Sequence, residues 1–350
     1  MNAPVAAVFY GSDRPLAIER FSWPELAFGE ALAEVDCCTL CGSDLHTIHG
    51  RRSVETPMIL GHEVVGRIVQ AEGPLADVSG AALEVGDRVS WSIAASCRSC
   101  FYCDDDIPQK CERLFKYGHR QVEPRHPLSG GLATHCHLAA GTPLVRWSQE
   151  VPDTVAALAN CATATVAAAL RTAGDFTDQT VVIHGAGMLG LTAAAMAREG
   201  GARHVAVLDI LPERAERAVQ FGASPEGAAA LEDWTEGRGA DVVLDMSGAP
   251  EAMENAVQQL RIGGRLILVG AVFPDRPLAL AAEQLVRKML RVEGVHNYAP
   301  CDLAAAAEFL ERSRQRYPFA SLVEREYPLE EINQAVAEAG QMVRAAVRPR

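Results

Sequence analysis

The sequence lacks an excess of positive charge, is poor in aromatic residues and has no long apolar run. Its 350 residues include 45 acidic and 32 basic side chains, which give a net charge of −13 at pH 7, and only 6% are aromatic. Such an acidic chain does not favour binding to nucleic acid or to an anionic membrane surface. No segment is predicted to be apolar for long enough to span a bilayer. Residues 1–10 also lack a basic stretch followed by an apolar core, so we expect a cytoplasmic protein.

The overall composition is that of a soluble globular protein, with 49% hydrophobic and 22% charged residues. The length allows two domains of ordinary size, each with its own core. Residues 1–150 show little helical periodicity and contain short predicted β segments divided by Gly, Pro and Asp. The clearest of these segments are 31–37, 64–70 and 87–93.

From residue 155 onward, Ala-rich helical stretches alternate with short apolar runs. The runs lie at 180–184, 204–209, 241–245 and 265–270. This alternation predicts βαβ units and a parallel sheet that is buried on both faces. Two further helical stretches are expected in the last fifty residues, at 302–312 and 329–339.

Ten cysteines are present, and because no export signal is found, metal binding is a better interpretation than disulfide bonding. Four of them follow the spacing Cys97-x2-Cys100-x2-Cys103-x7-Cys111. Four thiolates close a tetrahedral shell and leave no open position, so this spacing predicts a structural zinc ion. The alternatives are four unrelated thiols or an iron–sulfur cluster, although the usual ferredoxin spacings differ. No role is expected for Cys37, Cys38, Cys136 and Cys301.

A second group of candidate zinc ligands includes Cys41, His62 and the distant Cys161. A Cys and a His alone are more typical of a buried core, but the neighbours of Cys41 and His62 favour a metal site. They supply a hydroxyl, an imidazole and two carboxylates, from Ser43, His46, Asp44 and Glu63. A catalytic zinc takes three protein ligands and keeps one position open for water or substrate. This group therefore predicts a catalytic zinc.

A dinucleotide-binding motif, Gly185-Ala186-Gly187-Met188-Leu189-Gly190, follows the apolar run 180–184. A lone G-x-G-x-x-G is weak, but here a helix follows it and a second strand ends in Asp209. The helix N-terminus would receive the pyrophosphate. Asp209 would accept hydrogen bonds from the ribose and repel a 2′-phosphate, which favours NAD over NADP. Arg214 lies five residues further on and would reach the ribose or phosphate. Alternatively, it is a solvated charge on the surface of a helix.

Together these motifs resemble the zinc-dependent medium-chain alcohol dehydrogenase family over essentially the whole chain. The resemblance implies an α/β plus β fold, in which a GroES-like β-rich catalytic domain is split around a Rossmann doubly wound parallel sheet. The expected parts are 1–160 and 296–350 for the catalytic domain and 161–295 for the NAD-binding domain. The active site would lie in the cleft between them. Most relatives are dimers or tetramers, so a homo-dimer or homo-tetramer is expected.

The same resemblance implies two zinc ions per chain. Cys41, His62 and Cys161 match the ligands of the catalytic zinc, and the clustered cysteines match those of the structural zinc. Asp44 matches a carboxylate behind the ligands. Glu63 matches a carboxylate that in some relatives ligates the zinc itself.

The resemblance also implies roles in the reaction. Ser43 and His46 match a proton relay, and Thr165 and Val269 match positions near the nicotinamide. The implied reaction transfers a hydride between an alcohol, or the corresponding carbonyl compound, and NAD. A polyol or threonine-type dehydrogenase of the same family remains an alternative, as does a non-catalytic NAD-binding regulatory protein. A zinc-free quinone or enoyl reductase would lack the three catalytic ligands.

Candidate residues for the substrate pocket lie in three segments of the sequence. Ile93 and the segment 294–298 are expected to form pocket walls, and Arg51 and Arg52 follow the first zinc motif. More basic residues follow the cysteine cluster, and on counting alone the better explanation of both basic groups is two solvated loops. Arg forks suit phosphate-like or carboxylate oxygens. These stretches also resemble a bacterial subgroup associated with phosphonate catabolism, which implies an alcohol that carries an anionic group. Arg51 or Arg52 is expected to hold that group.

Overall fold

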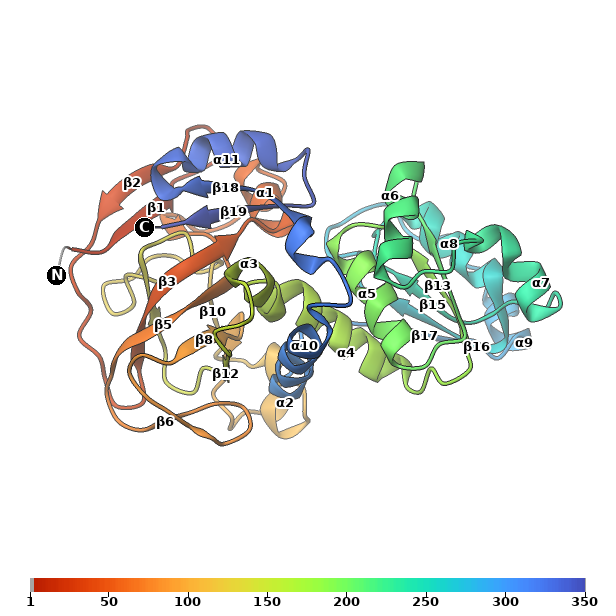
Figure 1. Ribbon diagram of the computed structural model, residues 1–350, viewed down its shortest axis with the longest axis horizontal. Helices are drawn as coiled ribbons and strands as arrows, with labels where there is room; N and C mark the ends of the chain where they lie inside the picture. Colours follow the sequence, from red (N-terminus) through yellow and green to blue (C-terminus); the bar gives the residue numbers. More distant parts are fainter. Residues whose placement is uncertain (1–2, 350) are drawn as a thin grey trace. The chain divides into compact units, whose positions relative to one another are not determined.

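The computed structural model describes residues 3–349 and divides them into two compact units. One unit contains the chain as far as Cys161, the segment Ala299–Arg314 and the chain from Phe319 onward. The other contains Ala162–Tyr298 and the short segment Gln315–Pro318, which was expected in the catalytic domain. Figure 1 labels the elements of both units.

A seven-stranded sheet forms the centre of the first unit, in the order β12-β8-β5-β3-β19-β18, with β11 also paired to β3. The expected segments 31–37 and 64–70 are confirmed within β3 and β5, and β8 covers residues 88–91 of the expected 87–93. The bounds are β3 (Ala31–Thr39), β5 (Glu63–Ala71), β8 (Arg88–Trp91), β11 (His135–Leu138), β12 (Leu144–Arg146), β18 (Val323–Pro328) and β19 (Arg344–Arg348). Smaller sheets pair β1 (Val5–Phe9) with β2 (Ala17–Arg20) and β4 (Met58–Ile59), β6 (Leu75–Ala76) with β7 (Ala82–Leu83), and β9 (Ala94–Ala95) with β10 (Phe115–Lys116).

The register of β3 and β5 explains why two distant motifs meet. These strands are antiparallel, and Thr39 at the end of β3 pairs with Glu63 at the start of β5. The residues that follow β3 and those that precede β5 therefore lie at the same end of the sheet. Cys41 and His62 occupy these positions, and both strands are held in register by the nearly continuous buried side chains of their cores.

Helices are few in the first unit, as expected. They are α1 (Gly42–Ile48), α2 (Phe101–Asp104), α3 (Asp153–Ala156), α10 (Pro300–Ser313) and α11 (Ile332–Ala339), with the short turns η1 (Pro108–Lys110), η5 (Phe319–Leu322) and η6 (Leu329–Glu331). The two helices expected near the C-terminal end are thus confirmed. Strands β18 and β19 were not expected there. The residues of β19 show no alternation of apolar and polar side chains, and this strand is stabilised by pairing with β3.

The second unit contains a five-stranded parallel sheet in the order β14-β13-β15-β16-β17. The apolar runs expected from the sequence are confirmed as four of these strands. The bounds are β13 (Thr180–His184), β14 (His204–Leu208), β15 (Ala240–Asp245), β16 (Leu260–Leu268) and β17 (Arg291–Gly294). The strand order reverses between β13 and β15, and α/β sheets of this kind bind ligands at the carboxyl ends of the strands beside such a reversal.

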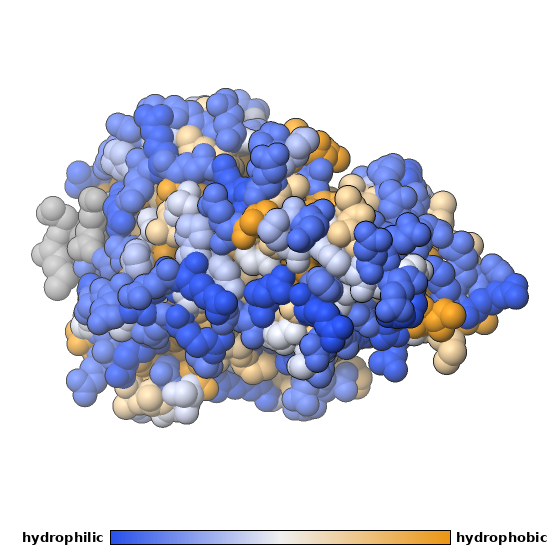
Figure 2. All heavy atoms as spheres, turned by 45° about the vertical axis from the view of Figure 1, so that its right-hand side comes forward, coloured by the Kyte–Doolittle hydropathy of each residue, from blue (hydrophilic) through white to orange (hydrophobic). Residues whose placement is uncertain are grey.

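Helices precede and connect these strands, as the alternating pattern predicts. They are α4 (Ala164–Ala173), α5 (Met188–Glu199), α6 (Pro212–Arg217), α7 (Leu231–Thr235), α8 (Pro250–Gln259) and α9 (Ala282–Arg287), with the turns η3 (Ala218–Phe221) and η4 (Gly227–Ala230). Figure 2 shows that hydrophilic residues cover most of the face in view.

One helical stretch corrects an expectation from the sequence. Asp153–Ala173 is 21 residues long with a mean hydropathy of 1.3 in its most apolar window, so by length and composition alone it could span a bilayer. In the structure 78% of that window is buried inside the protein. A core helix made largely of Ala, Val and Leu gives this pattern because its neighbours, not lipid, cover its sides.

Candidate zinc centres and dinucleotide site

Three atoms expected to bind one zinc ion lie together in the first unit. The Sγ atoms of Cys41 and Cys161 are 3.9 Å apart, and with His62 all three ligand atoms lie within 4.8 Å of one another. Tetrahedral zinc with bonds of about 2.3 Å to sulfur places two sulfur atoms about 3.8 Å apart. The distances and the Cys-His-Cys donor set therefore both fit a zinc ion with one open position. Cys161 lies in a π turn, η2 (Ala159–Thr163), a local widening that is frequent at functional sites.

Asp44 connects the two segments that carry Cys41 and His62. Its Oδ2 accepts a hydrogen bond from the Cys41 amide at 3.0 Å, and its Oδ1 accepts one from the Gly61 amide at 3.1 Å. The same Oδ1 lies 3.3 Å from His62 Nδ1. A fully buried Asp44 thus leaves the other ring nitrogen of His62 for the metal.

Glu63 was expected with the metal ligands, and the structure does not bring it into the three-atom cluster. Both of its oxygens accept hydrogen bonds from Arg344, Oε2 from Nε at 2.8 Å and Oε1 from Nη2 at 3.0 Å. The Thr39 hydroxyl also donates to Oε2 at 2.6 Å. Arg344 Nη2 lies in turn 3.9 Å from Cys41 Sγ. Glu63 is therefore bound to the Arg344 guanidinium and is not placed as a metal ligand. Sequence analysis missed Arg344 because the strand that carries it, β19, was not expected.

Ser43 and His46 lie one helical turn apart on α1. The Ser43 hydroxyl is 3.2 Å from His62 Nε2, so it stands beside the ligand cluster. His46 Nδ1 accepts a hydrogen bond from Arg51 Nη1 at 3.4 Å. Burial lowers the pKa of His46, and the charges of Arg51 and Arg52 lower it further. The imidazole is therefore neutral near pH 7 and able to accept a proton.

The four clustered cysteines also meet in the structure. The Sγ atom of Cys100 lies 3.5 Å from that of Cys103 and 3.9 Å from that of Cys111, and Cys97 lies 4.0 Å from Cys103. These distances again fit the edges of a tetrahedron around zinc. The Arg113 guanidinium, which hydrogen bonds to the thiol, lowers the pKa of Cys97 to about 5 and so favours the thiolate. Four sulfurs at these distances would complete the shell of a structural zinc ion.

Basic side chains near the three-ligand cluster form a group that sequence analysis noted only as charges. The ring of His119 packs against that of His62, with 4.8 Å between centroids. Arg52 Nη1 lies 3.2 Å from His119 Nδ1. Burial lowers the pKa of Lys116, and the nearby charge of Arg52 lowers it further. Ile93, an expected pocket wall, is only 5% exposed and its main-chain oxygen accepts a hydrogen bond from the amide that follows Lys116.

A third cluster of potential ligands has a different explanation. Glu30, His126 and His137 also bring three ligand atoms within 4.8 Å. Glu30 Oε2, however, accepts hydrogen bonds from Arg125 Nη2 at 2.6 Å and from the Ala27 amide at 2.8 Å, and His137 Nε2 lies 3.0 Å away. A guanidinium group already holds the oxygen that a metal would need. We therefore interpret the cluster as an ion-pair network.

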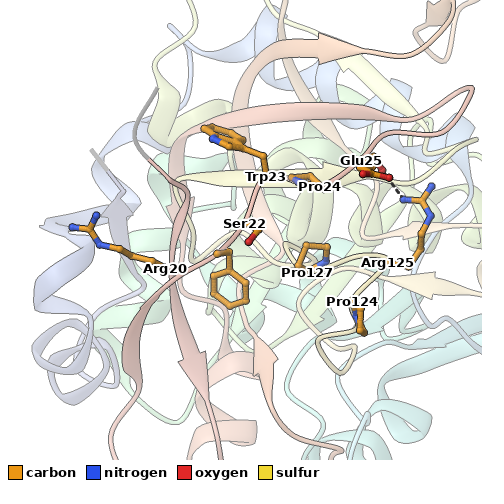
Figure 3. Close-up of a pocket in the computed structure, with 9 residues that line it drawn as sticks. Arg20, Ser22, Trp23, Pro24, Glu25, Pro124, Arg125 and Pro127 are labelled. Atoms are coloured by element: carbon orange, nitrogen blue, oxygen red, sulfur yellow. Dashed lines mark hydrogen bonds between the residues drawn. The ribbon is translucent and has the colours of Figure 1, made fainter.

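An open pocket of about 490 Å³ borders this network rather than the zinc ligands. Figure 3 shows Arg125 at its edge, where its guanidinium reaches the main chain of Glu25. The lining residues are Arg20, Phe21, Ser22, Trp23, Pro24, Glu25, Pro124, Arg125 and Pro127. None of them belongs to either cysteine cluster.

The glycine motif in the second unit adopts the geometry that a dinucleotide requires. Gly185 has φ +97°, and a Cβ on Gly190 would lie 1.7 Å from the Gly185 oxygen, so helix α5 packs directly on the turn. A Cβ on Gly187 would meet nothing within 4 Å, which leaves open space at the N-cap of α5. The first amides of a helix have no carbonyl partner within the helix, so those of Met188 and Leu189 would suit a phosphate there.

Asp209 follows β14 and turns toward the same motif. Its Oδ2 accepts a hydrogen bond from the Ala186 amide at 2.7 Å, and its Oδ1 accepts one from the Leu211 amide at 2.9 Å. Arg214 is exposed on α6, and Thr165 is half-buried on α4. Val269 is buried directly after β16, at the carboxyl end of the sheet. The motif and Asp209 are thus brought together.

Two family models match the chain. The alcohol dehydrogenase GroES-like domain matches residues 28–149, and the zinc-binding dehydrogenase model matches residues 189–312. A probable alcohol dehydrogenase of Mycobacterium tuberculosis is 32% identical over 340 residues, 93% of this chain and 91% of that protein. An L-threonine 3-dehydrogenase of Streptomyces avermitilis is 31% identical over 78% of each chain. The crystal structure of an alcohol dehydrogenase from Thermotoga maritima superposes with a TM-score of 0.93 at 30% identity and covers 100% of both chains.

Proposed function

Because this chain belongs to the zinc-dependent medium-chain alcohol dehydrogenase family, we propose that it transfers a hydride between an alcohol and NAD. The observation that carries the proposal is the meeting of Cys41, His62 and Cys161 in a three-ligand set, because a zinc site with an open position is a catalytic one. The clustered cysteines would hold a second, structural zinc. The direct test is NAD reduction by a panel of alcohols, and failure with every alcohol would contradict the proposal.

The bound groups would supply the bond chemistry, zinc as a Lewis acid and the nicotinamide as hydride acceptor or donor. The residues of the chain position these groups and move the proton. Asp44 fixes the orientation of His62, and Arg344 engages both carboxylate oxygens of Glu63. Ser43 stands beside the ligands, where its hydroxyl would accept the alcohol proton while it gives its own proton toward the nicotinamide ribose. His46 would accept the proton from the ribose and release it to solvent.

This proton path gives a pH prediction. Removing a neighbouring cation stabilises protonated His46, so Arg51→Gln should raise its pKa toward the ordinary value. Because the relay needs neutral His46, the acidic limb of the kcat/KM profile for alcohol oxidation should move to higher pH by about half a unit, a typical effect of one exposed charge. The shift should shrink at high salt. Identical profiles for both proteins would exclude His46 from the relay.

We also propose NAD rather than NADP as the cofactor, because the Asp209 carboxylate faces the glycine turn and would repel a 2′-phosphate. Asp209→Gly should lower kcat/KM for NAD by about 10-fold or more, the cost of a lost charge-assisted hydrogen bond, and lower it less for NADP. The measurement is kcat/KM with both cofactors, with the melting temperature as a check on folding. A wild-type protein that prefers NADP would contradict the role of Asp209.

For the substrate, we propose an alcohol that carries an anionic group, such as a phosphonate. The support is the concentration of Arg52, Lys116 and His119 beside the ligand cluster of an otherwise acidic protein. A threonine-type reaction is the second candidate, favoured by the identity to the L-threonine 3-dehydrogenase. We further propose a cytoplasmic homo-dimer or homo-tetramer, and the mass of the purified protein in solution tests the assembly.

A further inference from the structure

A fully buried side chain, that of Asn160, lies between two strands of the large sheet in the first unit. Its Oδ1 accepts a hydrogen bond from the Val64 amide at 3.1 Å, and its Nδ2 donates one to the main-chain oxygen of Trp91 at 2.7 Å. Val64 belongs to β5, and Trp91 is the last residue of β8. Asn160 itself lies in the π turn η2, directly before Cys161. The carboxamide therefore joins three elements at a position next to an expected zinc ligand.

The register of β5 and β8 explains what this side chain replaces. Toward the start of β5, the antiparallel pairing of the two strands ends at Gly66, which lies opposite Val89. Continued by two residues, the same register places Val64 opposite Trp91. A carboxamide has an acceptor oxygen and N–H donors in one plane, as a peptide group has. Asn160 thus bonds to one amide and one carbonyl at the point where the two strands have separated, so that these buried groups are satisfied.

Both sides of this bridge are close in sequence to zinc ligands. Val64 is two residues after His62, and Asn160 is the residue before Cys161. The residue after Cys161 already belongs to the other unit. The position of the Cys161 thiol in the first unit therefore depends on how the turn is anchored there. The hydrogen bond between Val64 and Asn160 fixes that turn relative to the segment that carries His62.

Burial gives the bridge a strong preference for one geometry. Asn160 is 0% exposed, and Val64 and Trp91 are each 1% exposed. A buried amide or carbonyl that loses its partner costs about 1–3 kcal/mol, so a displaced turn is disfavoured. Zinc in turn accepts ligand distances only within about 0.2 Å of their usual values. A small displacement of the turn would therefore lower the affinity of the three-ligand site for zinc.

We propose that Asn160 is a positioning residue for the catalytic zinc, and that its side chain holds the Cys161 thiolate at the distance from the other two ligands that the ion requires. The inference rests on the zinc site of the proposed dehydrogenase function. Asp44 supports the segments of the other two ligands, whereas Asn160 supports the third.

The test measures zinc affinity in Asn160→Leu, which removes both hydrogen bonds at a similar side-chain volume. Competition with a chromophoric chelator, with metal analysis of the protein at each step, gives the affinity of each site. Asn160→Leu should weaken zinc binding at the three-ligand site by about 10- to 100-fold, the usual effect of losing a group behind a metal ligand. The four-sulfur site should keep its wild-type affinity.

Cobalt(II) provides a readout that a loss of stability alone would not change. Its ligand-field bands in the visible spectrum report the geometry of the bound metal. With cobalt at the three-ligand site and zinc at the four-sulfur site, these bands should be shifted in Asn160→Leu at full metal occupancy. A spectrum identical to that of wild type would overturn the inference.

Ser90→Ala is the matched control, because Ser90 is also fully buried and precedes Trp91 on β8. Its hydroxyl donates to the Ala156 oxygen at 3.2 Å and accepts a hydrogen bond from Trp147 Nε1 at 2.9 Å. Ser90→Ala should lower the melting temperature, as Asn160→Leu should, but leave zinc affinity and the cobalt spectrum unchanged. An equal loss of zinc affinity in both variants would be an effect of stability alone and would refute the role of Asn160.

Asn160→Ser covers the case in which Asn160→Leu does not fold. Its short hydroxyl cannot bond to both strands, and the space that it leaves can admit a water molecule to satisfy them. The same selective loss of zinc affinity, by at least about 10-fold, is expected. Wild-type affinity in a folded Asn160→Ser would contradict the proposal.

All of these measurements are made without substrate, so they decide this inference separately from the proposed function. A wild type that oxidises no alcohol would contradict the proposed function, while the zinc affinities and cobalt spectra would still support or refute the role of Asn160. A wild type that oxidises alcohols, together with unchanged zinc binding in Asn160→Leu, would overturn this inference alone.

Discussion

Replacement of Cys41 by serine is expected to abolish alcohol oxidation while the protein stays folded. The substitution removes one of three ligand atoms at a site with an open position, and a serine hydroxyl is a poor substitute for a thiolate. Loss of partners behind metal ligands alone costs about 10- to 100-fold in activity, so loss of a ligand should cost more than about 100-fold. Initial rates with NAD and the best alcohol measure the effect, and His62→Ala should behave alike.

Cys301→Ser provides the matched control, because Cys301 is an exposed thiol outside both clusters. It should retain full activity, two zinc ions per chain and the wild-type melting temperature. Cys41→Ser should instead contain about one zinc ion per chain. Activity of Cys41→Ser above a few per cent of wild type would contradict the assignment of the catalytic ligands.

The second large effect is expected on stability rather than on activity. Cys103→Ser should lower the melting temperature by roughly 10 °C. We expect the free energy of unfolding to fall by about 3 kcal/mol, and each kcal/mol lowers the melting temperature of a domain of this size by about 2–4 °C. The physical reason is that zinc binding contributes folding free energy at a closed site, where four sulfurs lie 3.5 to 4.0 Å apart in the measured pairs. Thermal melting with and without a chelator is the measurement.

A strong chelator should lower the melting temperature of wild type and of Cys301→Ser, and lower that of Cys103→Ser much less. If Cys103→Ser has the same melting temperature as wild type in the absence of chelator, the assignment of the four-sulfur zinc site is wrong.

Much of the architecture was predictable because its determinants are local. Apolar runs alternating with helices predicted β13 to β16. The spacing of the glycines predicted the tight turn that leads into α5. Only glycine fits at Gly190, because a Cβ there would lie 1.7 Å from the main-chain oxygen of Gly185. Cysteine spacing predicted the four-sulfur cluster, since few other arrangements use four thiols within fifteen residues. In these cases the chemistry of a short segment fixes its structure.

Other features depend on tertiary pairing that no short segment reveals. β19 has no strand pattern of its own, so neither the strand nor the contact of Arg344 with Glu63 was foreseen. Burial of 153–173 depends likewise on what surrounds it. His119 was visible as a basic residue, but its position beside His62 follows from Gly118 packing on Gly61.

The most direct test of the central claim is the rate of NAD reduction as a function of zinc content. Protein depleted of zinc at the Cys41, His62 and Cys161 centre by dialysis against a chelator should lose activity, and zinc should restore it in proportion to the occupancy of one site per chain. Full activity in protein that retains only the structural zinc would contradict the account.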